Sequence, residues 1–368
     1  VISVMNSHKT TRILMAPLDW GLGHATRCIP LIRAFQQQGC EVVLAADGAV
    51  AALLAAEFPN IRIVPLQGYG IRYSGGSSLV GSMLRQLPGI LRSINYEHQC
   101  LNNLLQQEQF DLIISDNRPG FWNKQVPCIY ITHQLLIHSG KGKWLNRLLQ
   151  QLHSRYIKNF HAVWVPDLPG NENLAGELSH PSKPIIHPTY IGLVSRLQPT
   201  TVTQQYELMI LLSGPEPQRT ILETNLLEQL QAFNGTVLFV RGLPNNTTIL
   251  AAPANITVHN HLPALQLQEA MAAAKLIICR SGYTTLMDLT RLQKKAVLIP
   301  TPGQPEQEYL AAYMQQQSIF PFFSQKEFVL TKAFSTVASF PYKQPFDDAA
   351  FHLHEEIAAS TIKSIEKA

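Results

Sequence analysis

The sequence predicts an α/β protein built from two domains, each with a parallel sheet. Three observations predict this class. Units of apolar strand, loop and helix recur along the chain, the series starts twice (at Arg12 and at Leu208), and residues 181–206, rich in Pro, Ser, Thr and Gln, separate the two series. A chain of 368 residues also exceeds one ordinary core. The expected division is residues 11–190, a linker at 191–206, residues 207–345 and a closing helix at 346–368.

The first series opens on an apolar strand at residues 12–17, a glycine loop at 18–24 and a helix at 25–38 that Gly39 closes. A helical crossover between neighbouring strands requires parallel pairing, so this opening sets the class. The further strands expected are 41–46, 61–65, 112–115, 128–132 and 162–166. The further helices expected are 49–57, 79–107 with a break near Pro88, and 143–159.

The second series repeats this order with a strand at 208–212, a loop at 213–217 and a helix at 218–233. Strands at 236–241, 256–259, 276–279 and 296–300 complete a second parallel sheet. The tail, residues 346–368, reads as an amphipathic helix that can cross back to the first domain.

Composition excludes several classes of protein. Hydrophobic residues make up 46% and charged residues 15% of the chain, and no apolar run reaches the roughly 18 residues that a membrane span needs. Five scattered cysteines lack any metal-ligand spacing, which favours reduced thiols and a cytoplasmic location. We expect no metal and no cofactor.

The net charge of +4 is unevenly distributed. Residues 1–190 hold 16 basic and 11 acidic residues, whereas residues 191–368 hold 13 and 14. No acidic residue lies between Asp116 and Asp167, and this stretch contains Arg118, Lys124, Lys141, Lys143, Arg147, Arg155 and Lys158. Such a stretch is either an ordinary solvated face or a surface for an anionic partner. The basic residues are not interleaved with aromatic ones, which argues against nucleic acid.

The most informative segments are two polar loops that follow strands of the second domain. The strand ending at Cys279 is followed by Arg280-Ser-Gly-Tyr-Thr-Thr-Leu-Met-Asp288, and the strand 296–300 is followed by a loop that holds Glu306 and Gln307. Open α/β sheets bind ligands at the carboxyl ends of their strands, so both loops are expected at one site. Amides and hydroxyl groups suit phosphate, and carboxylate and amide groups suit ribose and sugar hydroxyls. A lone helical Asp is usually a surface residue, but this combination favours a nucleotide-sugar site.

Each domain also opens on a loop of its own. Gly21-Leu-Gly-His24 is not a dinucleotide fingerprint, because Thr26 stands at the third glycine position, and a nicotinamide enzyme is therefore disfavoured. The loop is either a tight turn or a ligand loop, and His24 at the helix start favours the second, since its side chain accepts a proton at neutral pH. Ser213-Gly214 opens the second domain in the same way, as a phosphate loop or as a proline-rich turn.

These motifs resemble those of the GT-B glycosyltransferases of family 28, the group that contains the MurG-like and galactolipid-synthase-like enzymes. The matching residues are Gly21-Leu-Gly-His-Ala-Thr-Arg27, Ser213-Gly214, Arg280-Ser-Gly-Tyr-Thr-Thr-Leu-Met-Asp288 and Glu306-Gln307. The resemblance spans residues 11–320 and is nearest to an uncharacterised branch with the pattern GxGHxxR. The chain departs from the family at the glycine-poor loop after Ser213 and at Glu308, where MurG-like members carry glutamine.

The resemblance implies a GT-B fold, two Rossmann-like domains that face each other across a cleft. The second domain would bind a UDP-sugar without a metal, with Asp288 on the ribose and Glu306-Gln307 on the sugar. The donor-binding residues expected are Ser213, Gly214, Arg280, Ser281, Gly282, Thr284, Thr285, Asp288, Glu306 and Gln307. The first domain would bind the acceptor through Gly21, Gly23, Arg27, Arg118 and His133.

We therefore expect an inverting, metal-independent transfer from a UDP-sugar, such as UDP-GlcNAc or a UDP-hexose, to an anionic or lipid-linked acceptor in cell-envelope glycan or glycolipid synthesis. His24 is the first candidate for the base and Asp116 the second. Two alternatives stay open: a UDP-sugar hydrolase of the same fold, and a non-catalytic subunit that binds a nucleotide sugar.

Two segments are basic and amphipathic, residues 79–91 and 141–158. An interfacial helix on an anionic membrane has this pattern, and so does a helix packed on the sheet of the first domain. The sequence leaves both interpretations open. The first predicts peripheral contact with the inner face of the cell membrane.

Overall fold

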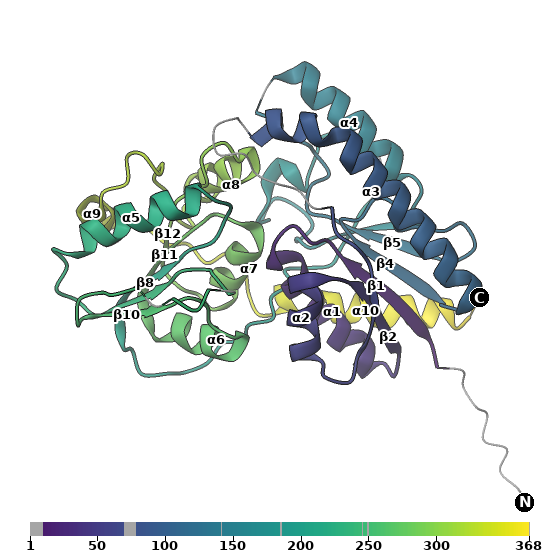
Figure 1. Ribbon diagram of the computed structural model, residues 1–368, viewed down its shortest axis with the longest axis horizontal. Coiled ribbons are helices and arrows are strands. Elements are labelled where there is room, and N and C mark those ends of the chain that lie inside the picture. Colours follow the sequence, from purple (N-terminus) through teal and green to yellow (C-terminus); the bar gives the residue numbers. More distant parts are fainter. Residues whose placement is uncertain are drawn as a thin grey trace, which may run out of the picture.

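The computed structural model describes residues 10–69, 79–140, 142–184, 186–244, 246–248 and 250–367, and over residues 79–85 only the backbone. These residues form two α/β domains placed side by side (Figure 1). Each domain has a sheet whose strands all pair in parallel, as the alternation of strands and helices predicts.

The first sheet has seven strands within the described residues, in the order β3-β2-β1-β4-β5-β6-β7. Their bounds are β1 Arg12–Pro17, β2 Glu41–Ala46, β3 Arg62–Pro65, β4 Leu112–Asp116, β5 Cys128–Ile131, β6 Ala162–Val165 and β7 Thr189–Tyr190. The central strands are apolar on both sides because helices cover both faces, and β4 is buried along its whole length. The order reverses between β1 and β4, which places the ends of these two strands at a switch point where α/β sheets bind ligands.

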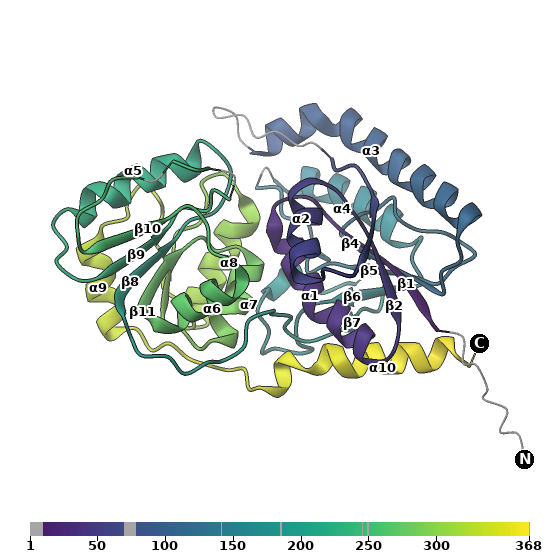
Figure 2. The same ribbon diagram turned by 60° about the horizontal axis from the view of Figure 1, so that its bottom comes forward.

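Helices cover both faces of the first sheet (Figure 2). On one face lie α1 (Leu22–Gln37) and α2 (Gly48–Glu57), and on the other lie α3 (Leu79–Gln107) and α4 (Lys143–Ile157). A short 3-10 helix, η1 (Gly176–Leu178), follows β6.

The second sheet has five strands among the described residues, in the order β10-β9-β8-β11-β12. Their bounds are β8 Tyr206–Leu211, β9 Val237–Val240, β10 Ile256–His259, β11 Ala274–Cys279 and β12 Ala296–Leu298. The helices are α5 (Gln218–Leu230), α6 (Ala264–Ala273), α7 (Tyr283–Arg291), α8 (Pro305–Gln316) and α9 (Leu330–Ser339). Helices α5 and α9 pack on one face of this sheet, and α7 and α8 lie on the side that meets the first domain (Figures 1 and 2).

The tail of the chain returns to the first domain. After the 3-10 helix η2 (Ala349–Phe351), helix α10 (Leu353–Ile365) lies beside α1, as both views show (Figures 1 and 2). The buried residues Ala358 and Ile362 of α10 join one apolar cluster that also holds Leu31 of α1 and Leu286 of α7. This cluster runs from one domain into the other and fixes how the two domains meet.

Three local expectations are corrected by the structure. Helix α3 continues through Pro88 instead of breaking there, so the missing amide of this proline leaves the helix intact. Helix α1 begins at Leu22, three residues earlier than expected, which places Gly23 and His24 in its first turn. The polar segment around Glu306 belongs to the start of α8, not to a loop, and Pro305 stands at its first position, where a proline suits a helix.

Candidate active site

Polar groups from three adjacent strands meet at one edge of the second sheet. Ser213 and Gly214 follow β8, Arg280 follows β11, and Thr301 follows β12. Gly214 has φ +100°, and a Cβ added to it would lie 3.3 Å from Thr301 Oγ1 and 3.9 Å from Arg280 Nε. The backbone of Gly214 therefore comes close to two polar side chains, and this approach requires a glycine.

Arg280 is a buried cation without a carboxylate partner among the described residues. Its side chain is 1% exposed, and it donates to backbone carbonyls: Nη2 to Gln218 O (2.9 Å) and Nη1 to Ile299 O (3.2 Å). Its Nε has no hydrogen-bond partner in the structure, and neither has the buried Oγ1 of Thr301. Burial lowers the pKa of Arg280 to about 10. A buried cation with an unused donor is completed by an anion that brings its own acceptor oxygens.

The start of α7 lies against the start of α1. Thr284 Oγ1 donates to Gly23 O over 3.3 Å, and a Cβ on Gly23 would lie 3.1 Å from this hydroxyl. The N-cap residues of these helices are Gly21 and Gly282, and neither supplies a side-chain cap. Thr285 is half-buried in the first turn of α7. Two helix N-termini with amides free of side-chain caps thus meet where the domains join, and both favour negative charge.

Asp288 lies one turn further along α7, against the segment that links the domains. Its Oδ1 accepts a hydrogen bond from Ser195 Oγ (2.5 Å). Burial raises the pKa of Asp288 to about 6, although this hydrogen bond and the nearby cation of Arg196 oppose the change. Among the described residues, the buried Nε of Arg196 has no hydrogen-bond partner. The carboxylate therefore has one oxygen that no described group engages, which a hydroxyl-bearing ligand can use.

Glu306 and Gln307 differ in what they contact. Gln307 braces the loop after β12, since its Oε1 accepts from Thr301 N (2.9 Å) and its backbone oxygen accepts from the buried Ser281 Oγ (2.8 Å). The carboxylate of Glu306 instead reaches the first domain, where it accepts from His133 Nε2 (2.8 Å) and from Gln134 Nε2. About a third of the Glu306 side chain is exposed.

In the first domain, the ionisable side chains of His24, Arg27 and Asp116 contact one another. Asp116 ends β4 with no exposed surface and accepts from Arg27 Nε (2.9 Å), from Arg27 Nη2 and from the Cys28 thiol (3.5 Å). Burial alone would raise the pKa of Asp116, but the Arg27 guanidinium and His24 together outweigh it and lower this pKa. His24 Nδ1 lies 3.3 Å from Asp116 Oδ2 and 2.8 Å from Arg27 Nη2. Burial, with the Arg27 charge, lowers the pKa of His24, so its imidazole is neutral at pH 7.

His133 connects this group to the second domain. Its Nδ1 lies 3.3 Å from Arg27 Nη1, and its ring stacks on Tyr283 with centroids 4.2 Å apart. A guanidinium can only donate, so Nδ1 accepts and Nε2 carries the hydrogen that bonds to Glu306 Oε1. The candidate base of one domain and the candidate sugar ligand of the other therefore belong to one network of hydrogen bonds.

Arg118, which was predicted to bind the acceptor, is buried inside the first domain. Its side chain is 1% exposed, pairs with Glu97 (2.7 Å) and donates to Pro17 O (2.8 Å). The same Glu97 accepts from Tyr69 Oη (2.8 Å), and the backbone amide of Tyr69 donates to Asp19. These contacts hold the loop that precedes Gly21, so Arg118 supports the loop from inside the domain and presents no free face.

The two basic segments are only partly described. On α4, Lys143, Arg147 and Arg155 are exposed, next to Trp144 (75% exposed) and Leu148 (46% exposed). Lys141 lies outside the described residues, and so do the side chains of residues 79–85 with Leu79, Val80, Met83 and Leu84. The apolar residues of α4 named here do not pack on the sheet.

Several residues of the site were missed by sequence reasoning. Thr301 was detectable, because it follows a strand next to Arg280 and obeys the same rule of strand ends. Ser195 and Arg196 were not, since they lie in the segment expected to be a linker. Gln134 directly follows the predicted residue His133, but its contact with Glu306 spans 172 positions of the chain.

Within the described ranges, no helix has both the length and the apolar character that crossing a bilayer requires. In that same part of the chain, no three or more His, Cys, Asp or Glu side chains are grouped closely enough to hold a metal ion.

Comparisons with known proteins fit this geometry. Residues 237–350 match the model of the glycosyltransferase family 28 C-terminal domain. A UDP-N-acetylglucosamine–N-acetylmuramyl-(pentapeptide) pyrophosphoryl-undecaprenol N-acetylglucosamine transferase from Haemophilus ducreyi is 22% identical over 304 residues, which cover 79% of this chain and 78% of that protein. Among solved structures, the glycosyltransferase of kitacinnamycin aligns over 97% of this chain and 99% of its own, with TM-score 0.67 and 16% identity. MurG from Acinetobacter baumannii aligns over 98% and 100%, with TM-score 0.56 and 16% identity.

The chain has the GT-B fold, as the aligned structures and its two parallel sheets show. The family 28 match, which covers residues 237–350, supports a glycosyltransferase.

Proposed function

We propose that this protein transfers a sugar from a UDP-sugar to an anionic or lipid-linked acceptor, with inversion at the anomeric carbon and without a metal ion. The observation that carries the donor half of this proposal is the pair of buried, unpartnered atoms Arg280 Nε and Thr301 Oγ1 beside Gly214. A diphosphate placed there would satisfy both atoms and neutralise Arg280.

The remainder of the donor extends in two directions from this point. The free amides at the start of α7 favour the leaving diphosphate, and their fixed dipoles stabilise the charge that develops on it. Asp288 is suited to the ribose hydroxyls, and Arg196 lies close enough to influence its charge. Glu306 is suited to the hydroxyls of the sugar, in exchange for its present bonds to His133 and Gln134. Uridine is proposed from the name of the Haemophilus ducreyi relative.

His24 is the proposed base. In its neutral form, Nε2 can take the proton of the acceptor hydroxyl only when the ring hydrogen is on Nδ1 and points to Asp116 Oδ2. Arg27 Nη2 donates toward the same Nδ1 and favours the other tautomer, which cannot accept a proton at Nε2. The hydrogen bonds between Arg27 and Asp116 therefore influence which tautomer of His24 is present. The imidazolium formed during the transfer would be stabilised by Asp116.

Asp116 itself is poorly suited to act as the base. It has no exposed surface, and its oxygens are occupied by Arg27. Its lowered pKa also makes it a weak proton acceptor at neutral pH. We therefore assign it the orientation of His24 and Arg27.

An anionic or lipid-linked acceptor is supported by the exposed face of α4. Trp144 and Leu148 with Lys143 and Arg147 have the composition of a helix that lies in the headgroup region of an anionic membrane. The protein would then act as a peripheral enzyme at a membrane surface, on an acceptor whose reactive end lies in the water layer.

The hydrolase alternative needs the same donor site with water in place of the acceptor, and the binding-subunit alternative needs the donor site alone. One assay separates the three. UDP release is measured over a panel of UDP-sugars, with and without a lipid extract of a bacterial membrane. Release that depends on the extract supports the transferase, release without it identifies a hydrolase, and UDP binding without release identifies a binding subunit.

A further inference from the structure

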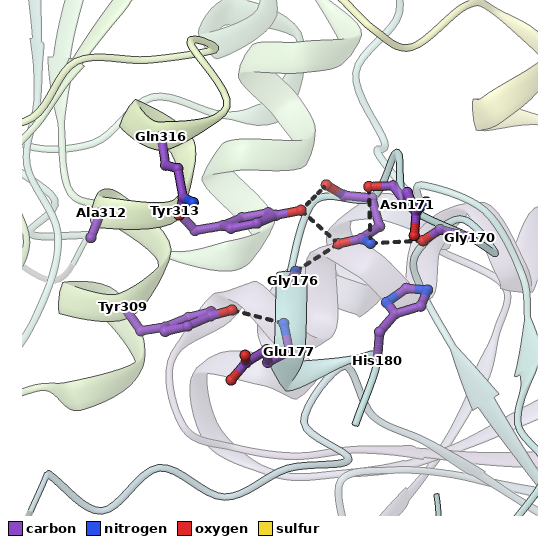
Figure 3. A pocket seen from close by; sticks show the side chains of 10 residues that line it. Gly170, Asn171, Gly176, Glu177, His180, Tyr309, Ala312, Tyr313 and Gln316 are labelled. Carbon is purple, nitrogen blue, oxygen red and sulfur yellow. Dashed lines mark hydrogen bonds between the residues drawn. The ribbon is translucent and has the colours of Figure 1, made fainter. Parts of the chain in front are cut away.

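A cavity lies beside the candidate active site, between α8 and the segment of residues 170–180 that follows β6 (Figure 3). Its volume is about 520 Å³. One wall comes from the second domain, through Tyr309, Ala312, Tyr313 and Gln316 of α8, and the other from the first domain. The cavity is therefore complete only when the two domains are together.

The two walls are held in place by direct contacts. The backbone amide of Glu177 donates to Tyr309 Oη (2.7 Å), and Tyr313 Oη donates to Asn173 Oδ1 (3.2 Å). Figure 3 shows both hydroxyls reaching from α8 to the segment of the first domain. Gly176 has φ +56°, and a Cβ there would overlap the Tyr309 hydroxyl and lie 3.1 Å from the Tyr313 ring. The positive φ and this close approach both favour a glycine at this position.

The lining has the chemistry of a carbohydrate site. The rings of Tyr309 and Tyr313 are nearly parallel, with 6° between their planes and 6.1 Å between their centroids. A pyranose has an apolar face of C–H groups that packs on an aromatic ring and an edge of hydroxyl groups that needs donors and acceptors. Asn171, His180 and Gln316 supply polar groups, and Glu177 supplies one carboxylate. Among the described residues no Lys or Arg lines this cavity, so it is not built for a phosphate.

The position of the cavity indicates which part of the reaction it serves. Tyr309 lies three residues after Glu306, about one turn along the same helix. The diphosphate end of the donor is assigned to the other end of this turn, beside Thr301, which precedes α8 and whose amide donates to Gln307 Oε1 (2.9 Å). A ligand in the cavity therefore lies beyond the transferred sugar and against the acceptor-binding domain.

We infer that this cavity binds a neutral sugar unit of the acceptor, next to the unit that receives the new sugar. The acceptor is thus a glycoside of at least two carbohydrate units. This inference rests on the proposed function, since it assigns a further subsite of the same reaction. Because the subsite needs both walls, acceptor selection would also depend on the contact between the two domains.

The test uses neutral disaccharides as probes: chitobiose, cellobiose and lactose. Their binding to the full-length protein is measured by saturation-transfer NMR, with and without UDP, and the affinity for UDP is measured on the same samples by calorimetry. The variant Ala312→Trp fills the cavity from an exposed position and removes none of the contacts described above. Ala55→Trp is the matched control, an exposed alanine on α2.

We expect at least one disaccharide to bind, and Ala312→Trp to weaken it at least tenfold while Ala55→Trp leaves it unchanged. The affinity for UDP should change less than twofold in both variants. A second variant, Asn171→Ala, should weaken the same disaccharide without filling the cavity. If UDP binds but no disaccharide does, or if Ala312→Trp has no effect, the subsite is refuted and the proposed function stands. If UDP fails to bind, the proposed function is refuted, and the disaccharide measurement without UDP still decides the cavity.

Discussion

His133 Nε2 of the first domain lies 2.8 Å from Glu306 Oε1 of the second. This hydrogen bond ends a chain of polar contacts that starts at Asp116 and passes through Arg27. The residues proposed to activate the acceptor and to hold the donor sugar are therefore coupled across the domain boundary. A sugar that binds Glu306 changes the hydrogen bonding of His133, and through Arg27 it changes the surroundings of His24.

Glu306→Gln tests this coupling. The variant keeps an oxygen that can accept from His133 but loses the charge that strengthens bonds to sugar hydroxyls. We expect kcat/KM with a UDP-sugar to fall about 10–100-fold, as for the loss of a charged hydrogen bond. The calorimetric affinity for UDP, which lacks the sugar, should stay within twofold. Equal losses for UDP and UDP-sugar would mean that Glu306 holds the domains together and does not contact the sugar.

His24→Ala should slow the transfer without affecting the donor site. Removal of a general base typically costs about 10²–10⁴-fold in kcat. His24 donates to no donor-site residue in the structure's described part, so UDP affinity should be unchanged. His187→Ala is the control, because His187 is an exposed histidine of the same domain. A turnover that His24→Ala leaves unchanged would remove this residue from the mechanism.

The affinity for UDP should depend on pH through Asp288. Its pKa is about 6 in the folded protein and 3.8 in the absence of burial. Between these values the folded protein holds a proton that the unfolded chain has released, so this group's contribution to the free energy of unfolding falls as pH rises toward 6 and is constant above it. Ribose hydroxyls bind better to the ionised carboxylate, so UDP affinity should fall as pH decreases from 7.5 to 5.

The variant Asp288→Asn should bind UDP more weakly at pH 7.5 and lose most of this pH dependence. Asp47→Asn, at an exposed aspartate that caps α2, is its matched control and should behave like the natural protein. Calorimetric titrations at pH 5, 6 and 7.5 measure the effect. A dependence that persists in Asp288→Asn would assign it to another group.

Membrane contact through α4 predicts binding to vesicles of anionic lipid that weakens as salt increases. The double variant Trp144→Ser with Leu148→Ser should abolish most of the co-sedimentation. Leu265→Ser is the control, because Leu265 is 74% exposed but lies on α6 of the other domain. Binding that ignores lipid charge, or that the double variant retains, would contradict the assignment of this face.

The fold followed from the sequence because local patterns determine parallel α/β units. Buried strands such as β1 and β4 are continuous apolar runs, and the helices α1 and α2 between them begin at or next to a glycine, Gly21 and Gly48. Helix α8 was missed because its first turn consists of polar residues, and a proline there can either start a helix or interrupt one.

The donor site could also be predicted in outline, because strand ends meet at one edge of a parallel sheet and Arg280 follows a recognisable strand. The partners of these residues could not be predicted. Ser195 bonds to Asp288 across 93 positions of the chain, and His133 bonds to Glu306 across 173. Such contacts depend on how the two domains pack against each other through the apolar cluster of α1, α7 and α10. A local sequence pattern cannot predict them. The burial of Arg118 could not be predicted for the same reason, because an arginine in a basic stretch is expected to be exposed.

The proposed donor site depends on Arg280, whose guanidinium is buried without a carboxylate partner among the described residues and would bind the diphosphate of a UDP-sugar. Calorimetric titration of UDP into the natural protein and into Arg280→Met tests it most directly, with Arg155→Met, an exposed arginine of α4, as control. We expect UDP to bind the natural protein and the control alike, and to bind Arg280→Met about 10–100-fold more weakly, as for a lost charged hydrogen bond. If UDP fails to bind the natural protein, or binds Arg280→Met equally well, Arg280 is not the ligand of the diphosphate.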